Sequence, residues 1–258
     1  MFRTITTLAA IAPLLALPAH AIAAEPAKAG FSLGGGLAVV PEYAGASRLR
    51  ALPLIVAEYQ SGTGFFSGSR GIGYETSVDG VGVSAAFTYD AGRKDRQKAG
   101  ALGSDDLKGM GDIKGAAVGV FGTSYDAGFA KLSLDAHLAA SNRARGNTYV
   151  VGLSRPLFVS AEHQVALTAS ATYADAKSVQ TYFGVTAAQA TASGYRAYRP
   201  GAGFESITMA LNWNLVLDAH WSVRSAAGLS RLVGDAGASP IVRRRSQALL
   251  GTTLNYAF

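Results

Sequence analysis

The sequence predicts an all-β fold: an antiparallel transmembrane β-barrel of about twelve strands, with ten strands as the alternative. Apolar residues alternate with polar ones through most segments, which is the period of a strand with two different faces. The polar partners are mainly Ser, Thr, Gly, Asn and Gln, which suit a crowded barrel lumen better than a solvated face. Short connections also alternate with long ones along the chain, as they do in outer-membrane barrels.

The composition limits the chemistry that the chain can perform. Of its 258 residues, 49% are hydrophobic and 16% are charged, which is incompatible with a disordered chain. Cysteine is absent, which excludes disulfides, thiolate zinc sites and a cysteine nucleophile, and the four His residues leave little material for a metal site. We therefore expect no cofactor. The formal net charge of +6 does not by itself separate nucleic acid, an anionic membrane surface or no partner.

Residues 1–24 have the pattern of a secretory signal peptide. Arg3 provides the positive region, Leu8 to Leu17 provide the apolar core, and small-x-small cleavage sites end at Ala21 and Ala23. The apolar core is shorter than the ~20 residues that a spanning helix needs. We therefore expect residues 25–258 to form one exported barrel domain.

Segments of alternation and the turns between them define the strands. The alternation is clearest over residues 81–89, 207–217 and 248–258, and such runs match the ~9–11 residues that a tilted strand needs to cross a bilayer. Residues 64–77 lie between two short turns, so a hairpin near residues 68–71 is required for both turns to lie on one side. The predicted strands are 31–40, 48–60, 64–68, 70–77, 81–91, 112–125, 129–141, 147–160, 163–174, 203–217, 221–233 and 246–258.

The connections predict an orientation. Barrels of the outer membrane have short periplasmic turns and longer external loops. We therefore expect both termini in the periplasm of a Gram-negative bacterium and the long loops outside the cell. The short turns are 61–63, 79–80, 126–128, 161–163 and 218–220, and the long loops lie near 41–47, 92–111, 142–147, 175–202 and 234–245.

Aromatic side chains mark the predicted strand ends. The last strand ends on Leu254, Tyr256 and Phe258, which alternate with polar residues. This terminal aromatic strand resembles the signal that the barrel-insertion machinery recognises, although a strand that merely ends in Phe is the alternative. We expect two aromatic girdles at the membrane interfaces, formed by Tyr43, Phe65, Phe66, Tyr89, Phe129, Phe158, Trp221 and Tyr256.

Several motifs also resemble those of a known family. They are Val-Pro-Glu-Tyr-Ala-Gly-Ala at 40–46, Arg-Gly-Ile-Gly-Tyr at 70–74, Gln-Thr-Tyr-Phe-Gly-Val-Thr at 180–186 and Ser-Arg-Leu-Val-Gly-Asp at 230–235, with shorter matches at 111–113 and 239–242. Together they extend over nearly all of the exported chain, and the motif at 180–186 is the most specific. By these motifs the chain resembles the MipA/OmpV family of outer-membrane proteins.

The resemblance implies a non-enzymatic outer-membrane barrel. The family's namesake is described as a scaffold that joins a lytic transglycosylase, which degrades murein, to a penicillin-binding protein, which synthesises it. Other members are linked to adhesion and to osmotic or antibiotic responses. The resemblance supplies no catalytic residues, and no visible motif defines the residues that contact the partners.

One polar cluster invites an enzymatic interpretation. Ser133, Asp135 and His137 are spaced by two residues, so all three face the lumen if the leucines between them face lipid. Neighbours at this spacing are ~6.6–7 Å apart at Cα, whereas a catalytic triad needs hydrogen-bond contact with an oriented base. We therefore predict a hydrogen-bond network inside the lumen and no enzyme.

A narrow channel for small solutes is the alternative function, and a surface adhesin is a third possibility. Twelve strands fall between filled eight-stranded barrels and water-filled porins, so the strand number leaves an open or a filled lumen possible. Lumen side chains would set the selectivity of a channel. The candidate lumen residues are Lys114, Lys131, Asp135, His137, Asn212, Asn214 and Arg224.

Two groups of basic residues lie in predicted external loops. They are either solvated loop charges or contacts for lipopolysaccharide phosphates, which paired Arg side chains bind well. Nucleic-acid binding is not expected, because exported barrels do not meet it and no basic motif with interleaved aromatics is present. The long loop 175–202 contains four aromatic residues and forms either a plug or a binding surface. The candidate lipopolysaccharide contacts are Arg93, Lys94, Arg96, Lys98, Arg243, Arg244 and Arg245.

Overall fold

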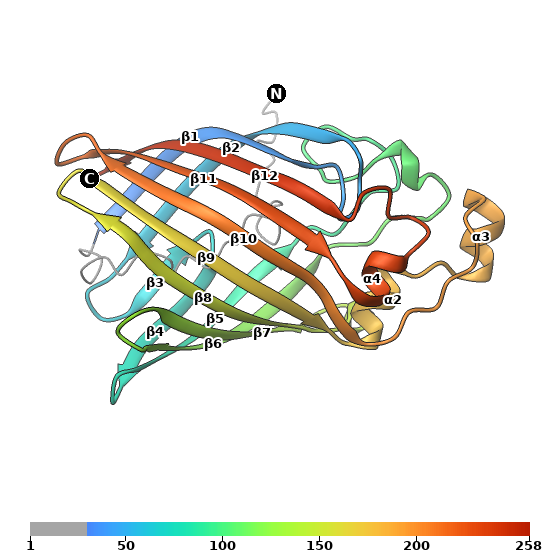
Figure 1. Ribbon diagram of the computed structural model, residues 1–258, viewed down its shortest axis with the longest axis horizontal. Helices are drawn as coiled ribbons and strands as arrows, with labels where there is room; N and C mark the ends of the chain where they lie inside the picture. Colours follow the sequence, from blue (N-terminus) through green and yellow to red (C-terminus); the bar gives the residue numbers. More distant parts are fainter. Residues whose placement is uncertain (1–29) are drawn as a thin grey trace, which may run out of the picture.

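A computed structural model describes residues 30–258, which form a closed barrel of twelve antiparallel strands (Figure 1). Each strand pairs with its neighbours in sequence, and β1 pairs with β12 to close the ring. The predicted fold class and strand number are confirmed, while the predicted signal peptide lies outside the described residues. The strands are β1 (Gly30–Pro41), β2 (Leu49–Gln60), β3 (Phe65–Gly68), β4 (Gly71–Val78), β5 (Val81–Asp90), β6 (Ala116–Asp126), β7 (Lys131–Ala139), β8 (Thr148–Val159), β9 (His163–Ala174), β10 (Gly203–Val216), β11 (Trp221–Leu232) and β12 (Ser246–Ala257).

The two ends of the barrel differ. One end, the turn end, has the short connections, the first described residue and the C-terminus; the other, the loop end, has the long connections (Figure 1). The loop end also has five short helical segments, which the sequence analysis did not predict. They are η1 (Asp105–Leu107), η2 (Arg143–Arg145), α2 (Ala176–Phe183), α3 (Ala187–Ser193) and α4 (Gly234–Ala238).

Side-chain capping explains why helices form inside the long loop between β9 and β10. The Asp175 side chain accepts a hydrogen bond from the backbone N–H of Ser178 and so caps α2. Thr186 and Gln189 form a reciprocal capping box at the start of α3. Each cap satisfies backbone N–H groups that have no partner within the helix.

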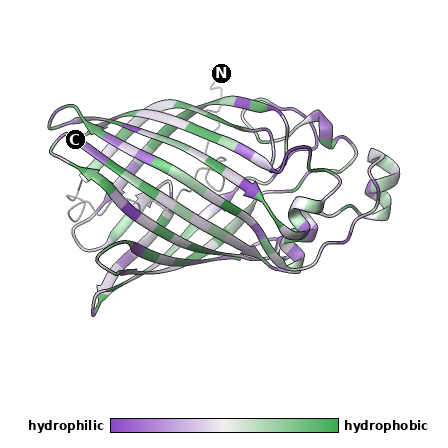
Figure 2. Cartoon of the chain, viewed as in Figure 1, coloured by the Kyte–Doolittle hydropathy of each residue, from purple (hydrophilic) through white to green (hydrophobic). Residues whose placement is uncertain are grey.

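The strands alternate between an apolar outer face and a more polar inner face. On β10, Ile207, Met209 and Leu211 point outward and are 44–51% exposed, whereas Ala210 between them is 2% exposed. Bands of hydrophobic residues run around the barrel wall in Figure 2. A continuous apolar exterior is what a barrel needs to face lipid. Within residues 30–258, no helix has the length and hydropathy to cross a bilayer.

Aromatic rings gather at both boundaries of this exterior. At the turn end, Phe258 lies 5.4 Å from Phe31 and 4.9 Å from Tyr256, measured between ring centroids. At the loop end, Tyr173 lies 6.4 Å from Tyr149 and 5.7 Å from Phe204. Rings at these two levels are typical of membrane-interface girdles.

Two of the predicted girdle residues are not on the exterior. Tyr43 is 1% exposed, because the loop after β1 folds over the barrel end and buries its ring among other loops. Phe66 is 4% exposed and lies inside the barrel, where the Arg70 guanidinium stacks 4.0 Å from the centre of its ring. Adjacent aromatics on one strand must point to opposite faces, so only Phe65 of the Phe65–Phe66 pair faces outward.

The seam where the barrel closes depends on glycine. A Cβ added to Gly36 would lie 1.9 Å from the carbonyl oxygen of Thr252 on β12, and one added to Gly34 would lie 2.1 Å from Oδ1 of Asn255. By contrast, a Cβ on Gly35 would meet only the Leu54 carbonyl oxygen, at 4.0 Å. Glycines on the inner face therefore let β1 and β12 approach closely.

We expect Gly36→Ala to destabilise the barrel by about 1–3 kcal/mol, because the new methyl group overpacks the seam. Gly35→Ala, the matched control one residue away on the outer face, should leave stability unchanged. The midpoint of urea unfolding in detergent micelles, followed by tryptophan fluorescence, measures both. Equal midpoints for the two variants would contradict this account of the seam.

Candidate functional site

The structure places six of the seven candidate lumen residues on the inner face of the wall. Leu132 and Leu134 of β7 are 42% and 46% exposed on the outside, so alternation turns their neighbours inward. Lys114 is the exception and the prediction for it was wrong. It is exposed and precedes β6, because that strand starts at Ala116 and not at residue 112. The inward residues are Lys131, Asp135, His137, Asn212, Asn214 and Arg224.

Two pairs of opposite charges lie inside the turn-end half of the barrel. Arg224 of β11 contacts Glu58 of β2 at 2.8 Å, over the intervening β1 and β12. Arg70 contacts Glu75 at 2.7 Å, and Gln60 donates to the other oxygen of the same carboxylate at 2.7 Å. Pairing offsets the cost of placing charges in a confined, partly desolvated space.

The polar cluster on β7 is not assembled into a catalytic site. Among residues 30–258, no hydrogen bond joins the side chains of Ser133, Asp135 and His137 to one another. The predicted network between them is therefore not formed. In the same part of the chain, no group of three or more His, Asp or Glu side chains is arranged to hold a metal ion.

The loop between β5 and β6 enters the barrel at the loop end. Its Leu102 packs on the inner faces of the wall strands, among Ala38, Leu52 and Leu249. Arg50 of β2 holds the same loop by donating to the carbonyl oxygens of Lys98, at 2.8 Å, and Ala101, at 2.9 Å. The loop therefore narrows the lumen below its external mouth.

Four long loops meet in an apolar loop cluster, made of Tyr43, Ala46, Leu107, Met110, Val185 and Ile241. The Tyr43 hydroxyl donates to the Ile241 carbonyl oxygen at 2.8 Å, and burial raises the pKa of Tyr43. Tyr195 and Tyr198 of the loop 175–202 pack against the cluster. Two aromatic residues of that loop therefore help to bury the cluster where the long loops meet.

A buried polar network joins other elements of the loop end. The guanidinium of Arg145, 6% exposed, contacts the Asp90 carboxylate at 2.5 Å and also donates to the Tyr182 hydroxyl. Tyr182 in turn donates to Asp90 at 3.1 Å. The network therefore ties η2 and α2 to the end of β5.

Arg93 lies beside this network, and the prediction that it contacts lipopolysaccharide was wrong. It is 7% exposed and donates to the Tyr182 carbonyl oxygen at 2.7 Å. Burial lowers the pKa of Arg93 to about 10, so it remains protonated at neutral pH. The Arg93 guanidinium therefore bonds to the backbone of α2 and is buried away from the protein surface.

The other basic loop residues differ in whether their side chains have a partner within the protein. Lys94 pairs with Asp112 at 2.7 Å, and this hydrogen bond holds the pKa of Asp112 below its ordinary value. Arg243 donates to the Tyr195 hydroxyl at 3.1 Å. The remaining four are exposed at the loop end: Arg96, Lys98, Arg244 and Arg245.

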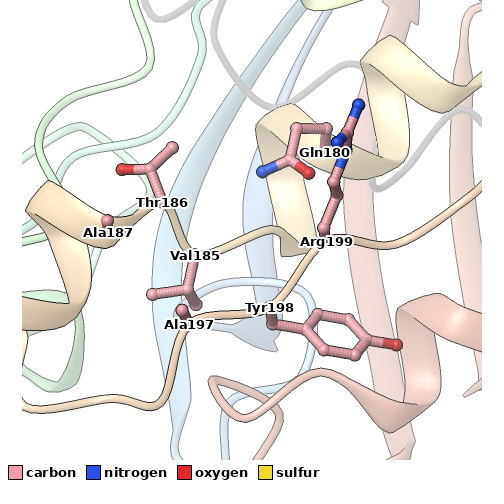
Figure 3. Close-up of a pocket in the computed structure, with 7 residues that line it drawn as sticks. All are labelled: Gln180, Val185, Thr186, Ala187, Ala197, Tyr198 and Arg199. Carbon is pink, nitrogen blue, oxygen red and sulfur yellow. The ribbon is translucent and has the colours of Figure 1, made fainter.

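A surface hollow of about 460 Å³ lies at the loop end between α2, α3 and the segment before β10. Figure 3 shows Gln180 and Arg199 side by side on one wall and Tyr198 on another. Val185 and Tyr198 exchange two backbone hydrogen bonds of 2.8 Å that fix its floor. The Gln180 Oε1 atom is buried without a partner among the described residues.

The proposed assembly residues lie on the outer face of the last strand. Leu254 is 45% exposed and Phe258 is 73% exposed, while Tyr256 packs edge-on against Trp221 with ring centroids 5.0 Å apart. This placement leaves their role in assembly as a prediction.

Sequence reasoning missed the network of Asp90, Arg145 and Tyr182. Its members are 37 to 92 positions apart in the chain, and no spacing rule links them. The only sequence signal was the motif around Tyr182, which marked the segment as unusual without saying what its hydroxyl contacts.

The comparisons decide the family. The family model described as MltA-interacting protein MipA matches residues 33–258, nearly all of the described chain. The chain belongs to this family. No curated protein is similar to it in sequence.

Solved structures of outer-membrane barrels show only distant likeness. OmpT of Vibrio cholerae is 9% identical, with a TM-score of 0.39, over 88% of this chain and 97% of that one. Salmonella typhi OmpF, solved with daunomycin, is 16% identical, with a TM-score of 0.33, over 79% of this chain. The chain spans about half the length of that OmpF, 50% of which is covered. At these TM-scores the likenesses carry no argument about function.

We expect Asp90→Asn to loosen the loop end, because removing one partner of a buried ion pair costs about 3 kcal/mol or more. Trypsin should then cut the loop 175–202, after Lys177 or Arg196, at least about tenfold faster. Asp112→Asn, which breaks the exposed pair with Lys94, is the control and should not change the rate. Unchanged cleavage in Asp90→Asn would show that the network does not hold the loop.

We expect the refolded protein to show no steady conductance in a planar bilayer, because the loop cluster and the inserted loop obstruct the path along the barrel axis. Deleting residues 176–199 removes only the part of the loop cluster that the loop 175–202 supplies, so measurable current in this variant would identify that loop as the main obstruction. Steady current through the intact protein would instead support the channel interpretation.

Proposed function

We propose that this MipA-family barrel is a non-enzymatic scaffold of the outer membrane of a Gram-negative bacterium. Its turn end faces the periplasm, and there it binds a lytic transglycosylase and a penicillin-binding protein. The family description, MltA-interacting protein, supports a murein enzyme as one partner. The apolar exterior and the two aromatic girdles support the membrane location.

The observation that carries the proposal is the charge of the turn end. Four of its short turns each present one exposed carboxylate, and within these turns there is no Lys or Arg. Within residues 30–258 no ion pair neutralises them, and they are spaced along the barrel rim from β4 to β11. We call these residues the acidic rim: Asp79, Asp126, Glu162 and Asp218.

The acidic rim suits a partner with a basic surface. Complementary charge raises the association rate and selects the partner, even where each contact is weak. The turns are short, so a partner that lies against the rim meets several carboxylates together. The loop end has the opposite character, because its free basic residues are exposed there, and we propose that they face lipopolysaccharide phosphates.

Neutralising the acidic rim tests the scaffold function. A variant with Asp79→Asn, Asp126→Asn, Glu162→Gln and Asp218→Asn keeps the turn-forming residue shapes but removes the charges. We expect its affinity for the purified transglycosylase and penicillin-binding protein to fall at least about tenfold at low salt, with a weaker dependence on salt. Surface-immobilised barrel in micelles provides the measurement.

The matched control removes four charges at the other end, with Arg96→Gln, Lys98→Gln, Arg244→Gln and Arg245→Gln. This control should bind the two enzymes as the unmodified barrel does. Loss of binding in the control alone would place the docking surface at the loop end, and undiminished binding in the rim variant would refute the acidic rim as the docking site.

A further inference from the structure

The barrel wall is incomplete beside β2. β2 has twelve residues, but its neighbour β3 has four and turns back into β4 after Gly68. Only Tyr59 and Gln60 of β2 pair with β3. In Figure 1 the β3–β4 hairpin lies in the half of the barrel nearer the C-terminus. Among residues 30–258, no strand therefore adjoins the rest of β2 on this side.

The missing wall has defined boundaries. Its lower edge is the hairpin tip at Gly68–Gly71, and its far side is the end of β5 at Asp90. Its upper edge is the loop between β5 and β6, which Arg50 holds by two hydrogen bonds. The edge of β2 between these limits, residues 51–57, is roughly 20 Å long, and each of the two strands that stop short would occupy roughly 5 Å of wall. We call this gap the wall window.

Backbone groups of β2 point into the wall window. The Ser61 N–H donates to the Phe65 carbonyl oxygen on β3, so odd-numbered residues of β2 direct their N–H and C=O toward that side. The position of the Ala57 carbonyl oxygen, 3.3 Å from a Cβ built on Gly68, agrees. Within the described residues, no backbone hydrogen bond is formed by Ala51 or Ile55 toward this side. Backbone N–H and C=O groups without a hydrogen-bond partner are costly next to lipid, so the gap in the wall has an energetic cost.

Pro53 stands in the middle of this free edge. It is odd-numbered, so its nitrogen points into the wall window, where no acceptor is present among the described residues. Proline has no N–H to leave unpaired, and it prevents another strand from adding to the edge. The edge is therefore built to stay open and not to be sealed by a second chain.

The lumen is apolar next to the wall window. The inward residues of β2 at this level are Leu52, Leu54 and Val56, and Leu54 packs against the cluster formed around Leu102. On the opposite wall, the inner face of β9 has Thr168 and Ser170 instead. Outside the barrel, Ile55 is 71% exposed. An apolar surface therefore continues from the lumen, past the β2 edge, to the lipid-facing exterior.

We propose that the wall window is a lateral passage through which a small apolar molecule, of the width of one alkyl chain or one aromatic ring system, moves between the lumen and the acyl chains of the membrane. An apolar molecule in the lumen gains about 0.8 kcal/mol per CH₂ by leaving water for lipid, so the bilayer draws it outward. The passage is independent of the scaffold function and of the acidic rim.

The chain has no cysteine, so single cysteines report access to each side of the wall. Leu54→Cys places a thiol on the inner face beside the wall window. Ser170→Cys is the matched control, on the inner face of β9 where both β8 and β10 are paired with it. Both variants are reconstituted into vesicles and labelled with pyrene maleimide dissolved in the bilayer, or with a charged, water-soluble maleimide.

We expect the bilayer reagent to label Leu54→Cys at least five times faster than Ser170→Cys, and added naphthalene to slow only the labelling at position 54. Equal rates at the two positions would overturn the proposal. So would labelling of position 54 by the charged reagent alone, because that result describes a water-filled gap. Val56→Cys, also on the inner face of β2, supplies the same test if Leu54→Cys does not fold.

Discussion

A bilayer offers no hydrogen-bond partners, so each backbone N–H and C=O of a membrane-spanning strand must find one in a neighbouring strand. The closure of β1 on β12 meets this requirement for the strands at the two ends of the chain. It depends on Gly34 and Gly36, since any side chain there would meet β12 at less than contact distance. The acidic rim, the lumen and the loop cluster are positioned only because this ring is closed.

Closure encloses charges that would be solvated in an open sheet. The barrel answers by pairing them, Arg224 with Glu58 and Arg70 with Glu75, and by arranging Asp90, Arg145 and Tyr182 as one network at the loop end. At the turn end the acidic rim exposes four carboxylates, and at the loop end Arg96, Lys98, Arg244 and Arg245 are exposed. The molecule thus presents surfaces of opposite sign to the two sides of the membrane it spans.

The wall departs from the closure rule at one place, and the departure has its own supporting features. A short hairpin, a proline at the centre of the free β2 edge and an apolar lumen lining coincide there. Pro53, which lacks an N–H, lies where an N–H would have no partner among the described residues. The acidic rim and this gap lie on different parts of the barrel, so one protein has room for a docking surface and a passage.

The sequence by itself determined the barrel, its strand number and the inner and outer faces. Alternation and turn composition are local properties, so each strand can be recognised from its own residues. Even the short hairpin near Gly68 followed, from the need to keep both flanking turns on one side. Tertiary structure decided the rest. Tyr43 and Arg93 are buried because loops from distant parts of the chain fold over one barrel end, and Lys114 lies outside the wall because β6 starts only at Ala116. Contacts between residues up to about two hundred positions apart, such as Tyr43 with Ile241, leave no periodic trace in a sequence.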